Sequence, residues 1–325
     1  MRSIRKSRWS RAAVAAVASV LALGLSACGS SSDDADAGGA PVTVTHARGS
    51  TTISGTPEKI VALGNQWLDA TLALGITPVG YIDNIGVLAK TAVPWEPATL
   101  ASAKALNTGG NLAEQVAALE PDLILADPFI ADQKTYDELS KLAPTLPALG
   151  KDAVTPWQDQ VTTLGKVLHK ETDADRVIAG VRQRLDAIAA ANPGLKGKTF
   201  ASTWLAGPSQ LMVLTDPNDG SSKLFTQLGM TIPKNLSEQP ANQGRLALSP
   251  ERVNELQADL LLAGYSPGLD EKYRQLPGYP ELPAVRKGAV VFLTTMEISA
   301  VNQPTALSVP YLLDKLEPAF ANAAK

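Results

Sequence analysis

The chain has 325 residues, of which 45% are hydrophobic and 19% charged, and it contains one cysteine and two histidines. Residues 1–27 hold five of the 29 lysines and arginines and none of the 32 acidic residues, so the remaining chain carries a net charge of −8. This charge disfavours nucleic acid or an anionic lipid surface as the main partner. A single thiol excludes an internal disulfide, and the roughly 285 residues that follow residue 40 are enough for two domains.

Residues 1–27 have the features of a secretory signal. A basic start precedes an apolar run, residues 12–25, that is too short to span a bilayer comfortably as a helix. The run ends in Leu25-Ser26-Ala27-Cys28, which resembles the bacterial lipoprotein signal and implies that Cys28 is lipidated. A plain signal peptide with an incidental cysteine is the alternative. We therefore expect a protein anchored by lipid alone to the outer face of the cytoplasmic membrane, at the cell surface or in a periplasm.

The next segments predict a tether and then an α/β architecture. Residues 28–41 are small, polar and acidic, which is typical of a flexible linker. Short apolar runs then alternate with stretches of helical periodicity, such as residues 67–74 and 112–119. The strand candidates are residues 60–63, 78–81, 123–126, 200–204, 260–263 and 289–293. This alternation indicates parallel sheets covered on both faces.

An internal repeat suggests that the chain contains two similar lobes. Residues 114–126 align with residues 251–263 at a constant offset of 137 residues, with seven identities in thirteen positions. Each copy predicts a helix, a tight turn and a buried strand. Chance convergence of two helix–turn–strand units is the alternative.

Residues 172–192, between the two copies, predict a long helix. Residues 172–175 match a capping box, and Val177, Val181, Leu185 and Ile188 recur at helical spacing. A helix of about 20 residues reaches roughly 30 Å and could cross both lobes; an ordinary surface helix is the alternative. The expected organisation is a signal peptide (1–27), a tether (28–41), an N-terminal lobe (42–171), a linking helix (172–192) and a C-terminal lobe (193–325).

Several segments in order carry a resemblance to a known family over residues 42–316. They are residues 58–63, 72–80, 112–114, 121–124, 249–251 and 284–290. Together they resemble the substrate-binding proteins of ABC importers for iron–siderophores, haem and vitamin B12. Residues 61–64 and 93–95 look most like the siderophore branch. The resemblance implies an α/β fold with two Rossmann-like lobes joined by a single long α-helix, the helical-backbone class of periplasmic-binding-protein-like folds, with ligand in the cleft and small closure.

The function implied by this resemblance is capture of a ferric siderophore and its delivery to the subunits of an ABC permease. Such a protein is a monomer without cofactors and is not an enzyme. Cobalamin or haem is the alternative ligand. Two alternatives come from other classes of protein: a lipid-anchored hydrolase that uses only carboxylates, and a surface scaffold.

Glu114 and Glu251 occupy equivalent positions in the repeat. Each lies in the first turn of a predicted helix, after Asn111 and Ser249 as possible caps. An acidic residue there stabilises a helix through its dipole. The resemblance implies a further role, docking onto arginines of the two permease subunits, because paired charges fix the register of a complex.

Six residues that follow strands or lie in nearby loops are candidates for ligand contact. They are Trp67, Trp95, Phe129, Trp204, Arg245 and Tyr265. The carboxyl ends of strands in such sheets face the crevice, and aromatic rings and cations suit a bulky chelate. Arg245 could pair with a negatively charged ferric chelate. A ring packed in the core and a solvated arginine are the alternatives.

The sequence contains few of the residues and motifs that direct metal ligation or catalysis would require. His46 and His169 cannot form the cluster of imidazoles and carboxylates that holds bare zinc or manganese. We therefore expect iron to arrive within a chelator that fills its coordination sphere. No Gly-x-Ser-x-Gly turn or Gly-x-Gly-x-x-Gly loop is present in the sequence.

Overall fold

The computed structural model describes residues 39–152 and 154–325, which belong to one compact unit. The expected signal peptide, Cys28 and most of the expected tether lie outside the described residues. Within the described part, no helix is long and apolar enough to cross a membrane.

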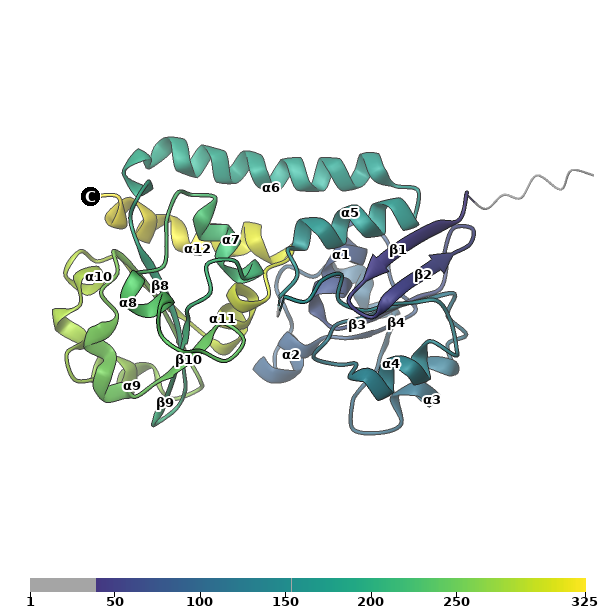
Figure 1. The fold of residues 1–325 in the computed structure, drawn as a ribbon, viewed down its shortest axis with the longest axis horizontal. Coiled ribbons are helices and arrows are strands. Elements are labelled where there is room, and N and C mark those ends of the chain that lie inside the picture. Colours follow the sequence, from purple (N-terminus) through teal and green to yellow (C-terminus); the bar gives the residue numbers. More distant parts are fainter. Residues whose placement is uncertain (1–38, 153) are drawn as a thin grey trace, which may run out of the picture. The chain divides into compact units, whose positions relative to one another are not determined.

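The N-terminal lobe is built on a five-stranded, fully parallel sheet in the order β5-β4-β3-β6-β7. Its strands β3 and β4 are labelled in Figure 1. Its strands are β3 (Ile60–Leu63), β4 (Gly80–Ile82), β5 (Lys104–Ala105), β6 (Leu123–Ala126) and β7 (Thr145–Leu146). Its helices are α1 (Asn65–Ala73), α2 (Asn84–Ala89), η1 (Ala98–Ser102), α3 (Leu112–Ala117), α4 (Gln133–Leu139) and α5 (Trp157–Val167). An antiparallel hairpin of β1 (Val42–His46) and β2 (Gly49–Ile53) precedes the sheet.

Both faces of this sheet are buried, as expected for parallel strands. Ile60 packs in the same cluster as Trp67 of α1 and Leu164 of α5. Its neighbour Val61 packs on the other face with Val116 of α3. Successive side chains of a strand point to opposite faces, so the continuous apolar run 60–63 supplies both cores.

The C-terminal lobe has a mixed five-stranded sheet in the order β10-β9-β8-β11-β12. Its strands are β8 (Phe200–Gly207), β9 (Gln210–Leu214), β10 (Arg245–Leu248), β11 (Leu260–Tyr265) and β12 (Val290–Leu293). Strands β8, β11 and β12 are parallel, whereas β9 runs antiparallel to both β8 and β10. The sequence predicted parallel pairing throughout, so the hairpin-connected β9 is a difference.

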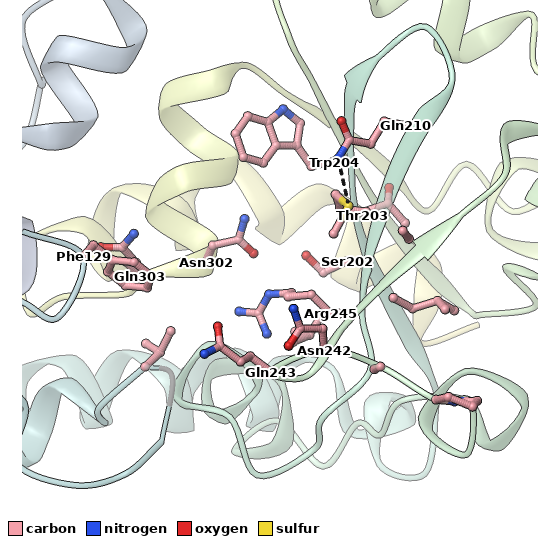
Figure 2. Close-up of a pocket in the computed structure, with 17 residues that line it drawn as sticks. Phe129, Ser202, Thr203, Trp204, Gln210, Asn242, Gln243, Arg245, Asn302 and Gln303 are labelled. Atoms are coloured by element: carbon pink, nitrogen blue, oxygen red, sulfur yellow. Dashed lines mark hydrogen bonds between the residues drawn. The ribbon is translucent and has the colours of Figure 1, made fainter. Parts of the chain in front are cut away.

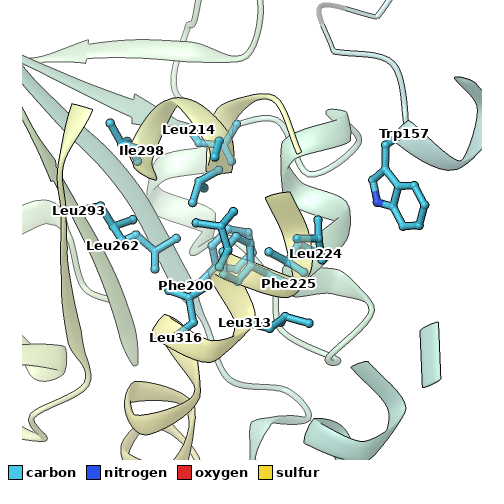
Figure 3. Packing of buried hydrophobic residues seen from close by; sticks show 14 of the residues in the cluster. Trp157, Phe200, Leu214, Leu224, Phe225, Leu262, Leu293, Ile298, Leu313 and Leu316 are labelled. Carbon is cyan, nitrogen blue, oxygen red and sulfur yellow. The ribbon is translucent and has the colours of Figure 1, made fainter. Parts of the chain in front are cut away.

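Helical elements surround this second sheet. They are η2 (Pro193–Leu195), η3 (Gly220–Ser222), α7 (Lys223–Thr226), α8 (Lys234–Ser237), η4 (Pro250–Glu255), α9 (Asp270–Arg274), η5 (Tyr279–Glu281), α10 (Pro283–Arg286), α11 (Thr295–Asn302) and α12 (Ser308–Ala323). Figure 3 shows their core, where the rings of Phe200 and Phe225 stack with centroids 4.4 Å apart and Leu313 and Leu316 of α12 pack nearby.

A single long helix, α6 (Glu171–Ala191), joins the two lobes (Figure 1). It packs on α5 of the first lobe and on α12 of the second. The predicted fold class, two α/β lobes joined by one long helix, is confirmed. The predicted capping box is wrong: Thr172 lies inside the helix, and the cap residue Lys170 makes no side-chain cap bond. A side chain caps a helix only from the non-helical residue that precedes it.

The two copies of the internal repeat occupy equivalent places in their sheets. Strand β6 lies between β3 and β7, and β11 lies between β8 and β12. Asp122 accepts hydrogen bonds of 2.9 Å from the N–H groups of Glu58 and Lys59, just before β3. Asp259 likewise accepts one of 3.0 Å from the N–H of Thr199, just before β8. The matched aspartate thus holds the start of the neighbouring strand in both lobes.

Candidate functional site

The hairpin strands of the C-terminal lobe leave one face open to a pocket. Strand β11 is buried along nearly its whole length, whereas β9 and β10 alternate between buried and more exposed residues. Trp204 lies opposite Met212, and Met212 lies opposite Ala247, so three neighbouring strands form one rung of the pocket floor. Antiparallel sheets commonly bury one face only, which explains why the pocket lies over this half of the sheet.

The pocket has a volume of about 670 Å³ and is lined mainly by the C-terminal lobe (Figure 2). Its walls come from the loop at residues 240–243 and from Asn302 and Gln303 at the end of α11. The N-terminal lobe contributes two residues, Phe129 and Val154. This volume lies within the usual range for sites that bind small molecules and cofactors.

One ion pair lies at the pocket. The Arg245 guanidinium donates from Nη1 to Asp219 Oδ2 (3.3 Å) and from Nη2 to Ser221 Oγ (3.2 Å). Arg245 retains 22% side-chain exposure, whereas Asp219 retains only 3%. Asp219 also accepts the backbone N–H of Ser221 at 2.8 Å. The cation of the pocket is therefore already paired with a buried carboxylate.

Side-chain carboxamides provide most of the remaining polar surface. They belong to Gln210, Asn242, Gln243, Asn302 and Gln303. Three polar atoms of the pocket are unusual, because the Ser202 hydroxyl, the Trp204 indole N–H and the carbonyl oxygen of the Gln303 carboxamide are buried without a hydrogen-bond partner in the described part of the chain. Buried polar atoms are nearly always paired in proteins, so these three mark a surface that suits a polar ligand.

The structure brings three of the six predicted contact residues together. Phe129, Trp204 and Arg245 all line the pocket. Phe129 lies just after β6 and is 56% exposed, which is unusual for a large apolar ring. Trp204 lies in β8 itself, and Arg245 begins β10. Arg245 is thus neither fully solvated nor unpaired, but forms an ion pair with Asp219 at the floor of the pocket.

The other three predicted residues lie outside the pocket. The Trp67 side chain has 0% exposure and packs in the core of the first lobe, so it does not line this pocket. Trp95 donates its indole N–H to Asp69 Oδ2 (3.0 Å) and packs against Tyr311, with ring centroids 5.2 Å apart. Tyr265 packs against Phe292, with centroids 6.3 Å apart.

Sequence reasoning missed strand β9 and the two polar loops of the pocket. Residues 210–214 form a short apolar run after a Gly-Pro turn, which is a hairpin signal for the strand that contains the missed Met212. The loops carry the same dipeptide, Asn-Gln, at residues 242–243 and 302–303. Nothing in either dipeptide alone distinguishes a pocket wall from a solvated loop.

A group of buried carboxyls lies outside the pocket, in the N-terminal lobe. Burial raises the pKa of Asp69 and that of Asp127 to about 7 each. Burial, reinforced by Asp83 and Asp69, raises the pKa of Glu96 to about 8. Asp127, the residue just after β6, accepts the N–H of Gln66 at its Oδ2 (3.1 Å) and so satisfies a backbone donor in the first turn of α1.

These carboxyls do not form a metal site. Among the described residues, no group of three or more His, Cys, Asp or Glu side chains is placed to hold a metal ion. His46 is 6% exposed and bonds to the Thr51 hydroxyl (2.9 Å). Burial, with Arg48 nearby, lowers the pKa of His46.

Known proteins share both the sequence pattern and the fold. The chain is 27% identical over 250 residues to the Fe(3+)-citrate-binding protein YfmC of Bacillus subtilis (strain 168), covering 74% of this chain and 75% of YfmC. It is 29% identical over 324 residues to the "Probable siderophore-binding lipoprotein YfiY" of the same organism, covering 91% and 94%. The structure of Streptococcus pneumoniae TIGR4 PiaA in complex with ferrichrome matches with a TM-score of 0.69 and 26% identity, over 87% of this chain and 98% of PiaA.

The family model described as "Periplasmic binding protein" matches residues 60–295, which include both five-stranded sheets and the long helix α6. The match covers well over half of the chain and agrees with the two lobes, the long helix and the pocket. The chain therefore belongs to the periplasmic binding protein family.

Proposed function

We propose that this protein captures a ferric siderophore in the pocket beside β8, β9 and β10 and delivers it to an ABC permease. The observation that carries the proposal is the pocket itself. It combines the rings of Trp204 and Phe129 with three buried polar atoms that have no protein partner among the described residues. Relatives named for ferric citrate, siderophore and ferrichrome binding support the same ligand class.

The residues of the pocket suit a chelate rather than a bare ion. A metal held directly by protein needs several carboxylates, imidazoles or thiolates at coordination distance. The lining instead offers rings and carboxamides, which contact the organic periphery of a large ligand. In this proposal the iron stays coordinated by its chelator, and the protein performs binding without catalysis.

Delivery requires a surface that the permease recognises, and we assign this role to Glu114 and Glu251. Both side chains are exposed. The Asn111 side chain caps α3 by accepting the N–H of Glu114 (3.2 Å), whereas Glu251 lies in the 3₁₀ helix η4 and Ser249 makes no side-chain cap bond. Glu114 follows β5, and Glu251 follows β10, which is parallel to β8 through two antiparallel pairings. Each glutamate thus lies beyond the carboxyl edge of its sheet.

Lipidation of Cys28 would keep the protein close to the permease to which it delivers its ligand. A short tether confines the receptor near its membrane partner and raises the effective concentration for docking. Relatives named as lipoproteins support an anchor at the outer face of the cytoplasmic membrane.

A titration of the soluble unit, residues 37–325, tests ligand binding directly. Ferric siderophores, haem and cobalamin are compared side by side by tryptophan fluorescence and calorimetry. We expect saturable binding of a ferric siderophore. Binding of haem or cobalamin alone would replace the ligand assignment, and no binding of any of the three at micromolar concentration would refute the receptor function.

The variant Trp204→Ala tests whether this pocket is the site. Removing a ring that packs against ligand lowers affinity by about tenfold or more, since a buried aromatic side chain contributes roughly 1.5–3 kcal/mol. Tyr136→Ala is the matched control, because Tyr136 is a partly buried ring that contacts Arg48 outside this pocket. Equal losses in the two variants would place the ligand elsewhere.

A further inference from the structure

The charges around the pocket balance within the protein itself. Arg245 carries the only charge among the described residues that line the pocket. Asp219 contacts its guanidinium through both carboxylate oxygens, at 3.3 and 3.4 Å. Because Asp219 is 97% buried, solvent does little to weaken the pairing. The pocket therefore presents a dipole rather than a net positive charge.

The charged side chains around the pocket are also balanced in number. Two smaller hollows adjoin it and share Gln243 with it. Together the three contain as many cations (Arg48, Lys151 and Arg245) as carboxylates (Asp152, Asp216 and Asp219), and Arg245 with Asp219 is the one ion pair among them in the described part of the chain. Inside the pocket itself, where Arg245 is already paired with Asp219, a multiply charged anion would lose its hydration without gaining an unpaired cation, and burial of a charge without such compensation is unfavourable.

The remaining polar groups suit a neutral ligand. In the described part of the chain, the side-chain amides of Asn242, Gln243 and Asn302 make no hydrogen bond to protein, and Figure 2 shows all three near Arg245. Each carboxamide offers both donors and an acceptor. Such groups recognise carbonyls and N–H groups without adding charge.

We propose that Asp219, by neutralising Arg245, restricts the pocket to ferric chelates of zero net charge. The proposal rests on the function proposed above. Three hydroxamate groups, each with a single negative charge, cancel the charge of Fe³⁺. Three catecholates leave a trianion, and citrate complexes are also anionic. The chemical class that fits the pocket is therefore a neutral ferric trihydroxamate.

Three probes of different charge test the ligand class on the soluble unit, residues 37–325. Ferrichrome is the neutral trihydroxamate, and ferric citrate and a ferric tris-catecholate are the anions. We expect ferrichrome to bind at least about tenfold more tightly than either anion. Its affinity should also stay constant between low and high salt, because screening acts on net charges. This measurement needs no variant and remains decisive if a substitution disturbs folding.

Asp219→Asn tests the residue. The amide keeps an oxygen that can accept the Ser221 N–H but frees the charge of Arg245. We expect the affinity for the anionic chelates to rise about tenfold, with ferrichrome changed less than about threefold. Asp216→Asn is the matched control, because it removes the same charge from an adjoining hollow and Asp216 has no contact with Arg245 among the described hydrogen bonds and ion pairs.

The outcomes separate this inference from the proposed function. Tighter binding of ferric citrate or the catecholate by the unmodified protein overturns the neutral-chelate class but leaves the receptor function standing. Preference for ferrichrome that Asp219→Asn does not alter, or that Asp216→Asn alters equally, overturns the role of Asp219. Failure of all three ferric chelates to bind overturns the proposed function and this inference together.

Discussion

Asp69 shows how a single buried carboxyl can link distant parts of this chain. It lies in α1 with 0% exposure and accepts hydrogen bonds from the Trp95 indole N–H (3.0 Å) and the Thr305 hydroxyl (2.5 Å). Thr305 lies between α11 and α12 of the C-terminal lobe, so its hydrogen bond to Asp69 joins that lobe to the first, whereas Trp95 belongs to the first lobe itself. The second carboxyl oxygen of Asp69 has no partner within the described residues. Burial raises the pKa of Asp69 from 3.8 to about 7.

This raised pKa predicts that stability falls as pH rises. Between about pH 4 and pH 7, the Asp69 carboxyl is protonated in the folded protein and ionised in the unfolded chain. The folded state therefore binds more protons, and its stabilisation by this group is lost as pH rises through about 7. Asp127 and Glu96 act in the same direction. We expect the urea midpoint at pH 5 to exceed that at pH 8.

Asp69→Asn separates this group from the others. The amide retains a hydrogen-bond acceptor and cannot ionise, so the difference between the two midpoints should shrink. Comparison with the unmodified protein also cancels His46, whose lowered pKa gives the opposite slope. Asp186→Asn is the control, since that side chain is 74% exposed on α6. An unchanged difference in Asp69→Asn would show that the buried carboxyl does not titrate as described.

At the scale of elements, two glycines illustrate opposite demands on the backbone. Gly180 lies near the middle of α6, is exposed, and has open space where a Cβ would be added. Gly264 lies in β11, where an added Cβ would come within 2.7 Å of the Thr203 carbonyl oxygen and of the Ile298 Cβ. The first glycine weakens a helix that connects the lobes, whereas the second permits α11 to pack closely on the sheet.

We expect the two alanine variants to change stability in opposite directions. Gly180→Ala should raise the free energy of unfolding by about 0.5–1 kcal/mol, because alanine has less backbone entropy to lose in a helix. Gly264→Ala should lower it by about 1–3 kcal/mol through overpacking against backbone. Urea unfolding of both variants measures the effect. Destabilisation by Gly180→Ala would mean that the exposed face of α6 is covered in solution.

At the scale of the whole molecule, the repeat places one exposed glutamate on each lobe. Glu114 and Glu251 correspond in the sequence alignment and follow corresponding strands of the two sheets. Neither forms an ion pair among the described residues, so both carboxylates remain available to a partner. An importer with two similar permease halves can use such a pair to fix orientation.

The double variant Glu114→Ala with Glu251→Ala should lose uptake of the siderophore while its ligand affinity stays unchanged, because both residues lie outside the pocket. Transport in cells and calorimetry on the purified protein measure the two quantities. The control is Glu58→Ala with Glu271→Ala, which removes one exposed glutamate from each lobe. A matching loss of affinity, or equal loss of uptake in the control, would refute the docking assignment.

Local patterns were sufficient to predict much of this fold. Buried strands such as β3 and β6 carry continuous apolar runs, and α6 carries apolar residues at helical spacing. These periods depend on backbone geometry within a few residues, so they can be read before any tertiary contact is known. The internal repeat also indicated that the two lobes are similar, and the matched turn aspartates, Asp122 and Asp259, make the same strand contact in each lobe. The anchor at Cys28 stays a prediction, outside the described residues.

The site depended on contacts between residues far apart in the sequence. Trp67 and Trp204 both occur at predicted strands or just after them, yet only Trp204 lies on a face that the hairpin leaves open. The ion pair of Arg245 could not be predicted from the sequence, because its partner, Asp219, lies 26 residues earlier and is brought near only by the pairing of β9 with β10. Periodicity determines which residues share a face, but only the assembled sheet and helices determine whether that face is covered and which charges are paired.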